Sequence, residues 1–219
     1  MKYDPQKHHR RSIRLKGYDY TQAGAYFITI CSNHREHVFG EIVNGELRCD
    51  AWGDIVRAEW FKTAELRPYV ELHGDEFVIM PNHGHGIIWI LENAGALRGI
   101  APLHEKIKFP ANRAEQRSAP TVKSGSLEAI VRAYKSAVTH AINGIDNTRG
   151  SVVWQRNYYE HIIRNDNELD AVANYIDCNP DNWQLDRDNA KNIRNLPVPE
   201  SVSDYLQDVQ EMMGGKINE

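Results

Sequence analysis

The sequence predicts an α+β fold in which helices pack on an antiparallel β-sheet. Segments rich in β-branched and aromatic residues, which favour strands, are interspersed with segments whose apolar residues recur at helical spacing. The two kinds of segment do not alternate strictly, as they would around a parallel sheet. Hydrophobic residues make up 41% of the chain and charged residues 26%, which is typical of a soluble globular protein.

The N-terminal part of this pattern predicts a strand, a hairpin and a helix. Residues 25–31 are mostly aromatic and β-branched, which favours a central strand. Asn44-Gly45, between two extended segments, is the strongest short signal for a hairpin turn. Asp50 is suited to cap a helix running to about residue 67, where Pro68 would end it.

Two strands, a helix, a strand and a helix follow. Residues 76–80 and 86–91 predict strands on either side of Pro81-Asn82. Ser126 can cap a helix to about residue 143, since apolar residues follow it at positions i, i+3 and i+4. Residues 152–163 predict extended chain, and Asn165 with Glu168 resembles a capping box that opens the last helix. The core order, βαββαβ, is that of the ferredoxin-like arrangement, with one further helix at its C-terminal end.

Composition predicts a single domain, residues 17–183, with an arm before it, an insertion within it and a tail after it. Residues 1–16 form a basic arm, and residues 93–125 predict a mobile insertion that is also basic and has no regular period. Residues 184–219 predict an acidic tail. The net charge is −4, but phosphate binding depends on local positive potential, so nucleic acid is compatible with this chain. The basic segments could equally be solvated loops.

Three features of the sequence bear on where in the cell the protein is expected. No segment approaches the run of about 18 apolar residues that a transmembrane helix needs, so we expect no membrane partner. The N-terminus lacks the apolar region of a secretory signal. Cys31, Cys49 and Cys178 are few, odd in number and without metal-type spacing, which favours a reduced cytoplasmic protein.

Four residues stand out as a possible site. His83 and His85 are one residue apart, so on a strand they point the same way about 7 Å apart and could close on one metal ion. Tyr175 and Asn179 lie one turn apart on one helix face, where the Asn179 oxygen could be a third ligand. Two imidazoles and one neutral amide oxygen would leave coordination positions open on a divalent ion such as Mg²⁺ or Mn²⁺. The Tyr175 hydroxyl could then attack a phosphodiester bound to that ion.

Each of these patterns also has an ordinary structural interpretation. A His-x-His pair is often incidental, Tyr175 could be a half-buried aromatic residue, and Asn179 could simply end its helix before Pro180. Tyr158 and Tyr159 are rival nucleophiles.

Three motifs, taken together, resemble the single-tyrosine HUH transposases, and most closely the REP-associated tyrosine transposases. They are Met80-Pro81-Asn82-His83-Gly84-His85, the block from Val153 to Arg164, and Tyr175-Ile176-Asp177-Cys178-Asn179-Pro180. The resemblance covers roughly residues 12–92 and 126–183, which makes residues 17–183 the expected catalytic domain. One position departs from the family, because Gly84 stands where a hydrophobic residue is usual.

The resemblance implies a role for each motif residue. His83 and His85 correspond to metal-binding histidines, Tyr175 to the nucleophile and Asn179 to the third metal ligand. It also implies an enzyme that cuts single-stranded DNA beside a hairpin, leaving a 5′-phosphotyrosine bond and a free 3′-hydroxyl. The insertion-sequence branch usually has glutamine four residues after the tyrosine, so Asn179 favours the REP-associated branch.

We therefore expect a metal-dependent transposase that acts on single-stranded or hairpin DNA as a monomer or homodimer, without ATP. Two alternatives remain open: a non-catalytic ferredoxin-like nucleic-acid-binding protein or repressor, and a metal-dependent hydrolase that uses water. The expected phosphate-binding residues are Arg10, Arg11, Arg14, Lys135, Arg156, His161 and Arg164.

Overall fold

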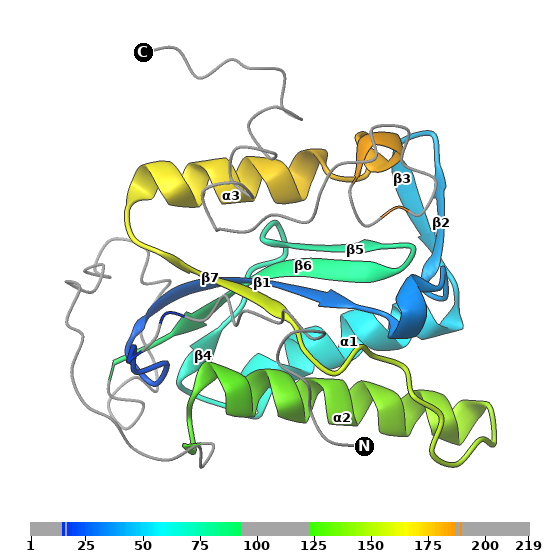
Figure 1. The fold of residues 1–219 in the computed structure, drawn as a ribbon, viewed down its shortest axis with the longest axis horizontal. Helices are drawn as coiled ribbons and strands as arrows, with labels where there is room; N and C mark the ends of the chain where they lie inside the picture. Colours follow the sequence, from blue (N-terminus) through cyan, green and yellow to red (C-terminus); the bar gives the residue numbers. More distant parts are fainter. Residues whose placement is uncertain (1–14, 16, 93–122, 187–188, 190–219) are drawn as a thin grey trace, which may run out of the picture.

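A five-stranded antiparallel sheet forms the middle layer of the computed structural model, which describes residues 15, 17–92, 123–186 and 189 (Figure 1). The strands run in the order β4-β6-β1-β7, and β5 also pairs with β6. Their bounds are β1 Gly24–Cys31, β4 Val70–Glu71, β5 Phe77–Met80, β6 His83–Ile90 and β7 Tyr159–Ile163. All their pairings are antiparallel. The predicted α+β fold with the ferredoxin-like strand order is therefore confirmed.

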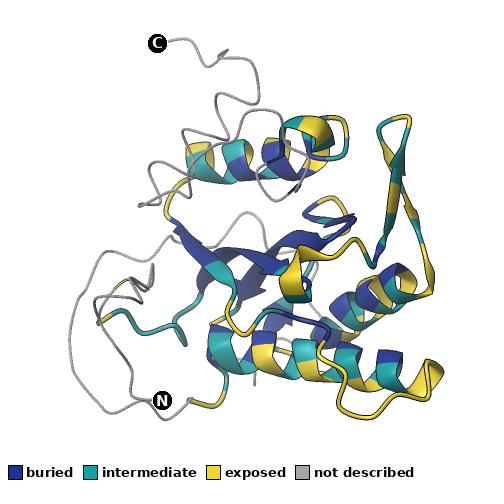
Figure 2. Ribbon diagram, turned by 45° about the vertical axis from the view of Figure 1, so that its right-hand side comes forward, coloured by how far each residue is buried: buried dark blue, intermediate teal, exposed yellow. Residues whose placement is uncertain are grey.

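Helices cover both faces of this sheet. In Figure 1, α1 (Ala51–Glu65) and α2 (Leu127–Ile145) lie on one side and α3 (Asp166–Cys178) lies on the other. Figure 2 shows the strands of the sheet as largely buried and the helices as buried along one side. No helix among the described residues is long and apolar enough to cross a membrane.

Local sequence signals set most element boundaries. The side chains of Asp50, Ser126 and Asn165 accept hydrogen bonds from backbone amides in the first turns of α1, α2 and α3. The hairpin β2 (Gly40–Val43) and β3 (Glu46–Cys49) turns at Asn44-Gly45, where both residues have positive φ. The three predicted N-caps and the hairpin turn are confirmed. The Glu168 side chain accepts a hydrogen bond from the Arg164 amide, which is one residue before the amide that a full capping box would use.

Two strands differ from their predicted extent. β6 begins at His83 rather than at Gly86, so the turn from β5 is limited to Pro81-Asn82 and both histidines lie within the ladder. In the segment expected to be extended, only Tyr159–Ile163 is a strand, because the carbonyls of Gln155 and Arg156 accept hydrogen bonds from the side chain of Lys135 on α2.

The side chains of β6 alternate between two cores. His83, His85 and Ile87 face α3, whereas Ile88 lies in the core formed with α1 and α2. Gly86 also belongs to the α1/α2 side, where a Cβ atom would lie only 2.5 Å from the Trp60 ring. A glycine is needed there because the aromatic ring packs directly on the strand backbone.

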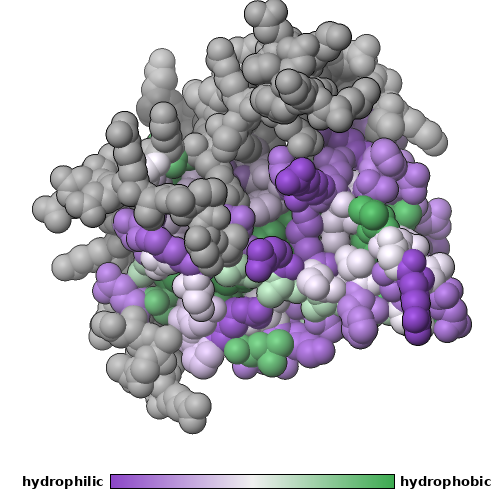
Figure 3. Space-filling view, turned by 60° about the horizontal axis from the view of Figure 1, so that its bottom comes forward, coloured by the Kyte–Doolittle hydropathy of each residue, from purple (hydrophilic) through white to green (hydrophobic). Residues whose placement is uncertain are grey.

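The surface turned to the viewer in Figure 3 is mostly hydrophilic, with apolar residues in small separate groups. Among the described residues, the exposed large apolar side chains are Leu15, Leu66, Ile145 and Val152. Such isolated side chains are ordinary on a protein surface.

Candidate metal and nucleophile site

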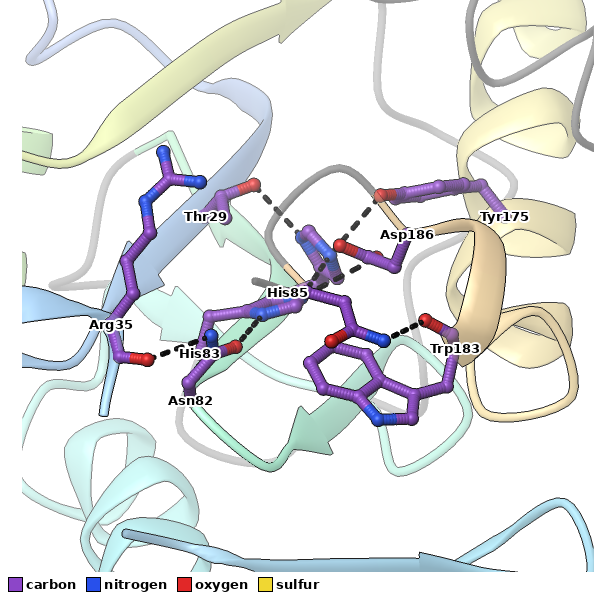
Figure 4. A network of polar contacts seen from close by, with 9 residues as sticks. Thr29, Arg35, Asn82, His83, His85, Tyr175, Trp183 and Asp186 are labelled. Atoms are coloured by element: carbon purple, nitrogen blue, oxygen red, sulfur yellow. Dashed lines mark hydrogen bonds and ion pairs between the residues drawn. The ribbon is translucent and has the colours of Figure 1, made fainter. Parts of the chain in front are cut away.

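His83 and His85 extend from the central strand β6 toward α3 (Figure 4). Their Nε2 atoms are 2.8 Å apart, and the two side chains are 0% and 1% exposed. Two nitrogen ligands of one metal ion, each bonded at about 2.0–2.1 Å, lie about 3 Å apart. The histidine pair therefore has the spacing that one ion requires.

Asn82 fixes the ring orientation of His83. Its Nδ2 donates a hydrogen bond to the Arg35 carbonyl at 3.1 Å, and its Oδ1 lies 2.8 Å from Nδ1 of His83. Since an amide oxygen only accepts, Nδ1 of His83 donates and Nε2 keeps its lone pair. Metal-binding histidines are characteristically held in this way. Asn82 was predicted as a turn residue and belongs to the motif that contains the histidines, but its contact with His83 was not predicted.

His85 is held by β1 and stays neutral. Its Nδ1 lies 2.8 Å from the Thr29 hydroxyl, which can donate or accept, and its ring stacks on Phe27 with centroids 5.6 Å apart. Burial, and then the neighbouring His83, hold the pKa of His85 well below its usual range. A neutral imidazole is the form that binds metal ions.

Tyr175 reaches the histidine pair from α3. Its hydroxyl is 3.2 Å from Nε2 of His85, and its ring meets Phe27 edge to face at 6.1 Å. Val172 and Ile176 of the same helix are buried in the core between α3 and the sheet, which fixes the side of the helix that Tyr175 presents. The predicted neighbours on the strand and the helix are thus brought together.

Asn179 forms the C-terminal cap of α3, one turn beyond Tyr175. Its side chain is 1% exposed, and among the described residues neither its oxygen nor its nitrogen has a hydrogen-bond partner. Burying an unpaired amide costs about 1–3 kcal/mol, so such a group calls for a ligand. The orphaned amide is consistent with a bound ion or a substrate at this end of α3.

Asp186 was not expected at the site. It is buried in the structure, and its Oδ2 lies 3.8 Å from Nε2 of His83 (Figure 4). One ligand atom from each of His83, His85 and Asp186 falls within 4.8 Å of the others, so the three could hold a metal ion. Asp186 falls in the segment predicted to be an acidic tail, because charge patterns carry no information on burial. The short helix Trp183–Leu185 turns this segment back over the histidines.

Comparison with known proteins places the chain in a family. An uncharacterised protein of Haemophilus influenzae is 40% identical over 186 residues, which cover 85% of this chain and 96% of that protein. The chain belongs to the family of that protein. No family model matches the sequence of this member.

A solved structure, a REP-associated tyrosine transposase bound to a REP hairpin, is similar at 18% identity. The match covers 81% of this member of the family and 77% of the transposase, with a TM-score of 0.48. At these values the likeness assigns no function to the family.

The residues expected to bind phosphate fall into three groups. Arg156 and Arg164 are exposed, whereas Arg10, Arg11 and Arg14 lie outside the described residues. Lys135 donates hydrogen bonds to the carbonyls of Gln155 and Arg156, and burial lowers its pKa to about 8. The side chain of His161 is 3% exposed and bonds to Glu168, so both His161 and Lys135 make contacts within the protein, and their role in DNA binding stays a prediction.

Proposed function

We propose that this chain is a metal-dependent tyrosine transposase that cleaves and rejoins single-stranded or hairpin DNA. One observation carries the proposal: the Tyr175 hydroxyl lies 3.2 Å from Nε2 of His85, and that atom lies 2.8 Å from Nε2 of His83. A potential nucleophile and two metal-type ligands thus meet at one buried point. The motif resemblance to the REP-associated transposases supports the same function.

Side chains from β6 and α3 would hold the ion. His83 and His85 would supply nitrogen lone pairs and Asn179 an amide oxygen, which suits Mg²⁺ or Mn²⁺ with open positions left for phosphate oxygens. When bound, the ion would draw electron density from the phosphate and stabilise the charge that builds on its oxygens.

Tyr175 would carry out the covalent step. Its hydroxyl loses a proton as the oxygen attacks phosphorus, and a bond forms between that oxygen and phosphorus. The bond from phosphorus to the 3′ oxygen breaks, and this oxygen takes up a proton and leaves as a 3′-hydroxyl. A 3′-hydroxyl from another DNA end can reverse the reaction and release Tyr175. Each step exchanges one phosphate ester for another, so ATP is not needed.

The proposed DNA surface uses the exposed arginines. Arg156 precedes β7, and Arg164 lies at its end, where the guanidinium also pairs with Glu168 at 3.7 Å. Arg10, Arg11 and Arg14 of the basic arm would add to it. Such contacts neutralise phosphates, so we expect DNA binding to weaken as salt concentration rises.

The test is a search for a covalent protein–DNA adduct. A labelled DNA hairpin with single-stranded flanks is incubated with the protein and Mn²⁺ and run on a denaturing gel. We expect an adduct with the wild type, with Tyr158→Phe and with Tyr159→Phe, but none with Tyr175→Phe. DNA cleavage that persists in Tyr175→Phe would indicate water as the nucleophile. DNA binding without adduct or cleavage, across several hairpins and both metals, would support the non-catalytic alternative.

A further inference from the structure

A short turn after α3 places Asp186 against the histidine pair. The Asp186 amide donates to the Trp183 carbonyl at 3.2 Å, and the Asn189 side chain donates to the same carbonyl at 2.9 Å. The Trp183 ring lies over His83, with ring centroids 6.0 Å apart (Figure 4). The position of the Asp186 carboxylate is therefore determined by specific contacts, as expected for a residue built into a site.

The separation between Asp186 and His83 fits an ion better than it fits a hydrogen bond. Nε2 of His83 carries a lone pair, because its Nδ1 donates to Asn82. The Asp186 oxygen is 3.8 Å from that nitrogen, which is too long for a hydrogen bond. Two metal–ligand bonds of about 2.0–2.2 Å each span as much as about 4 Å. An ion bonded to both atoms can therefore occupy this gap.

Charge gives a second, independent reason. An imidazole whose Nε2 binds an ion while Nδ1 carries a proton is neutral, so His83 and His85 bring no negative charge, and the Asn179 amide is also neutral. A divalent ion in so buried a site would be poorly compensated by these three groups. Asp186 is 1% exposed and offers the negative charge that the other ligands lack. Hard divalent cations prefer carboxylate oxygens for the same reason.

We propose that Asp186 is the anionic ligand of the ion held by His83 and His85. The inference rests on the proposed function, since it concerns the ion of that same site. The site then combines ligands from the sheet with one from the segment that follows α3. Asp186 would be a ligand in addition to Asn179.

The test measures metal binding without DNA. Isothermal titration with Mn²⁺ compares the wild type with Asp186→Asn and with Asp177→Asn, which removes an exposed carboxylate from α3. We expect Asp186→Asn to weaken Mn²⁺ binding at least about tenfold, since changes in the residues around metal ligands already cost about 10–100-fold. Asp177→Asn should bind Mn²⁺ as the wild type does.

Thermal unfolding separates a metal ligand from a purely structural residue. In EDTA, Asp186→Asn should melt at or above the wild-type temperature, because it removes a buried negative charge. With Mn²⁺, the wild type should gain stability and Asp186→Asn should gain much less. Equal Mn²⁺ affinity in the two proteins would overturn the proposal. A lower melting temperature in EDTA with unchanged affinity would make Asp186 structural.

The two proposals can fail separately. If Asp186→Asn keeps its Mn²⁺ affinity while Tyr175→Phe loses the DNA adduct, the ligand assignment is wrong and the proposed function stands. If Asp186→Asn loses affinity but the wild type forms no adduct, the metal site stands without the transposase chemistry.

Discussion

The hydroxyl of Tyr175 lies 3.2 Å from Nε2 of His85, although 90 residues separate the two in the chain. The contact joins α3 to the central strand of the sheet. Phe27 of β1 touches both rings, at centroid distances of 6.1 Å to Tyr175 and 5.6 Å to His85. The nucleophile proposed above is thus positioned by packing that involves two strands and a helix.

Tyr175→Phe should leave the fold and the metal site intact. The ring stays in its packing position, and loss of the hydroxyl's hydrogen bond to His85 costs about 1 kcal/mol of unfolding free energy. Urea unfolding and Mn²⁺ titration check this. A loss of several kcal/mol, or of metal affinity, would mean that the missing DNA adduct reports structural damage instead of chemistry.

Substitutions at Asn82 should separate ring orientation from turn structure. Asn82→Leu removes the acceptor for His83 Nδ1 and should weaken Mn²⁺ binding about 10–100-fold. Asn82→Asp keeps an oxygen for His83 while it loses the donor to the Arg35 carbonyl, so it serves as the matched control and should retain binding. Equal affinities for the two variants would rule out the orienting role.

The two glycines beside His85 should respond differently to alanine. At Gly84 an added Cβ would lie 3.6 Å from the Val78 carbonyl oxygen and 3.7 Å from the Phe77 ring, which are ordinary contacts. Gly84→Ala should therefore be neutral or stabilise by up to about 1 kcal/mol, since alanine costs less backbone entropy. Gly86→Ala would meet the Trp60 ring at 2.5 Å and should cost about 1–3 kcal/mol.

Denaturant melts of both variants give these free energies. If Gly84→Ala were as damaging as Gly86→Ala, the strand at the histidines would not have the space described above. A neutral result would mean that the fold accepts a side chain at Gly84.

His161 should make stability depend on pH. Burial lowers the pKa of His161, and the Glu168 carboxylate opposes this shift only in part. Below the unfolded pKa of about 6.5, the unfolded chain binds a proton that the folded protein takes up less readily. His161 therefore contributes its full share to the unfolding free energy above about pH 6.5. This contribution is lost as the pH falls toward the lower pKa of His161 in the folded protein.

The test compares unfolding free energies measured at about pH 7.5 and about pH 5.5, which lie on either side of the ordinary histidine pKa of about 6.5. His161→Gln should lose less stability between them than the wild type, whereas the exposed His140→Gln should lose as much as the wild type. An identical pH dependence for His161→Gln and the wild type would exclude His161 as the source.

Signals that act over a few residues were readable from the sequence. Asp50, Ser126 and Asn165 cap their helices through amides two or three residues away, and the Asn44-Gly45 turn needs only its own backbone. The histidine pair, Tyr175 and Asn179 became candidates because strand and helix periodicity place them on defined faces, and their expected roles came from the motif resemblance.

Features that depend on distant partners were missed. Lys135 lies on the polar side of an amphipathic helix, yet it bonds to a carbonyl 20 residues further along the chain. Asp186 follows the last helix in a polar, acidic segment, and only the turn at Trp183 brings it to His83. Composition cannot distinguish a solvated charge from one that is folded back onto a site.

The proposed ligands come from separate parts of the protein, since the histidines belong to the sheet whereas Asn179 caps α3 and Asp186 follows it. An ion bound by both would cross-link these layers, and its binding free energy would add to the apolar contacts that dock α3. Backbone amides of α3 should then exchange with solvent deuterium more slowly once Mn²⁺ is added, while those of β6 change little. The proposed cofactor would in this way also control how firmly the nucleophile helix is attached to the sheet.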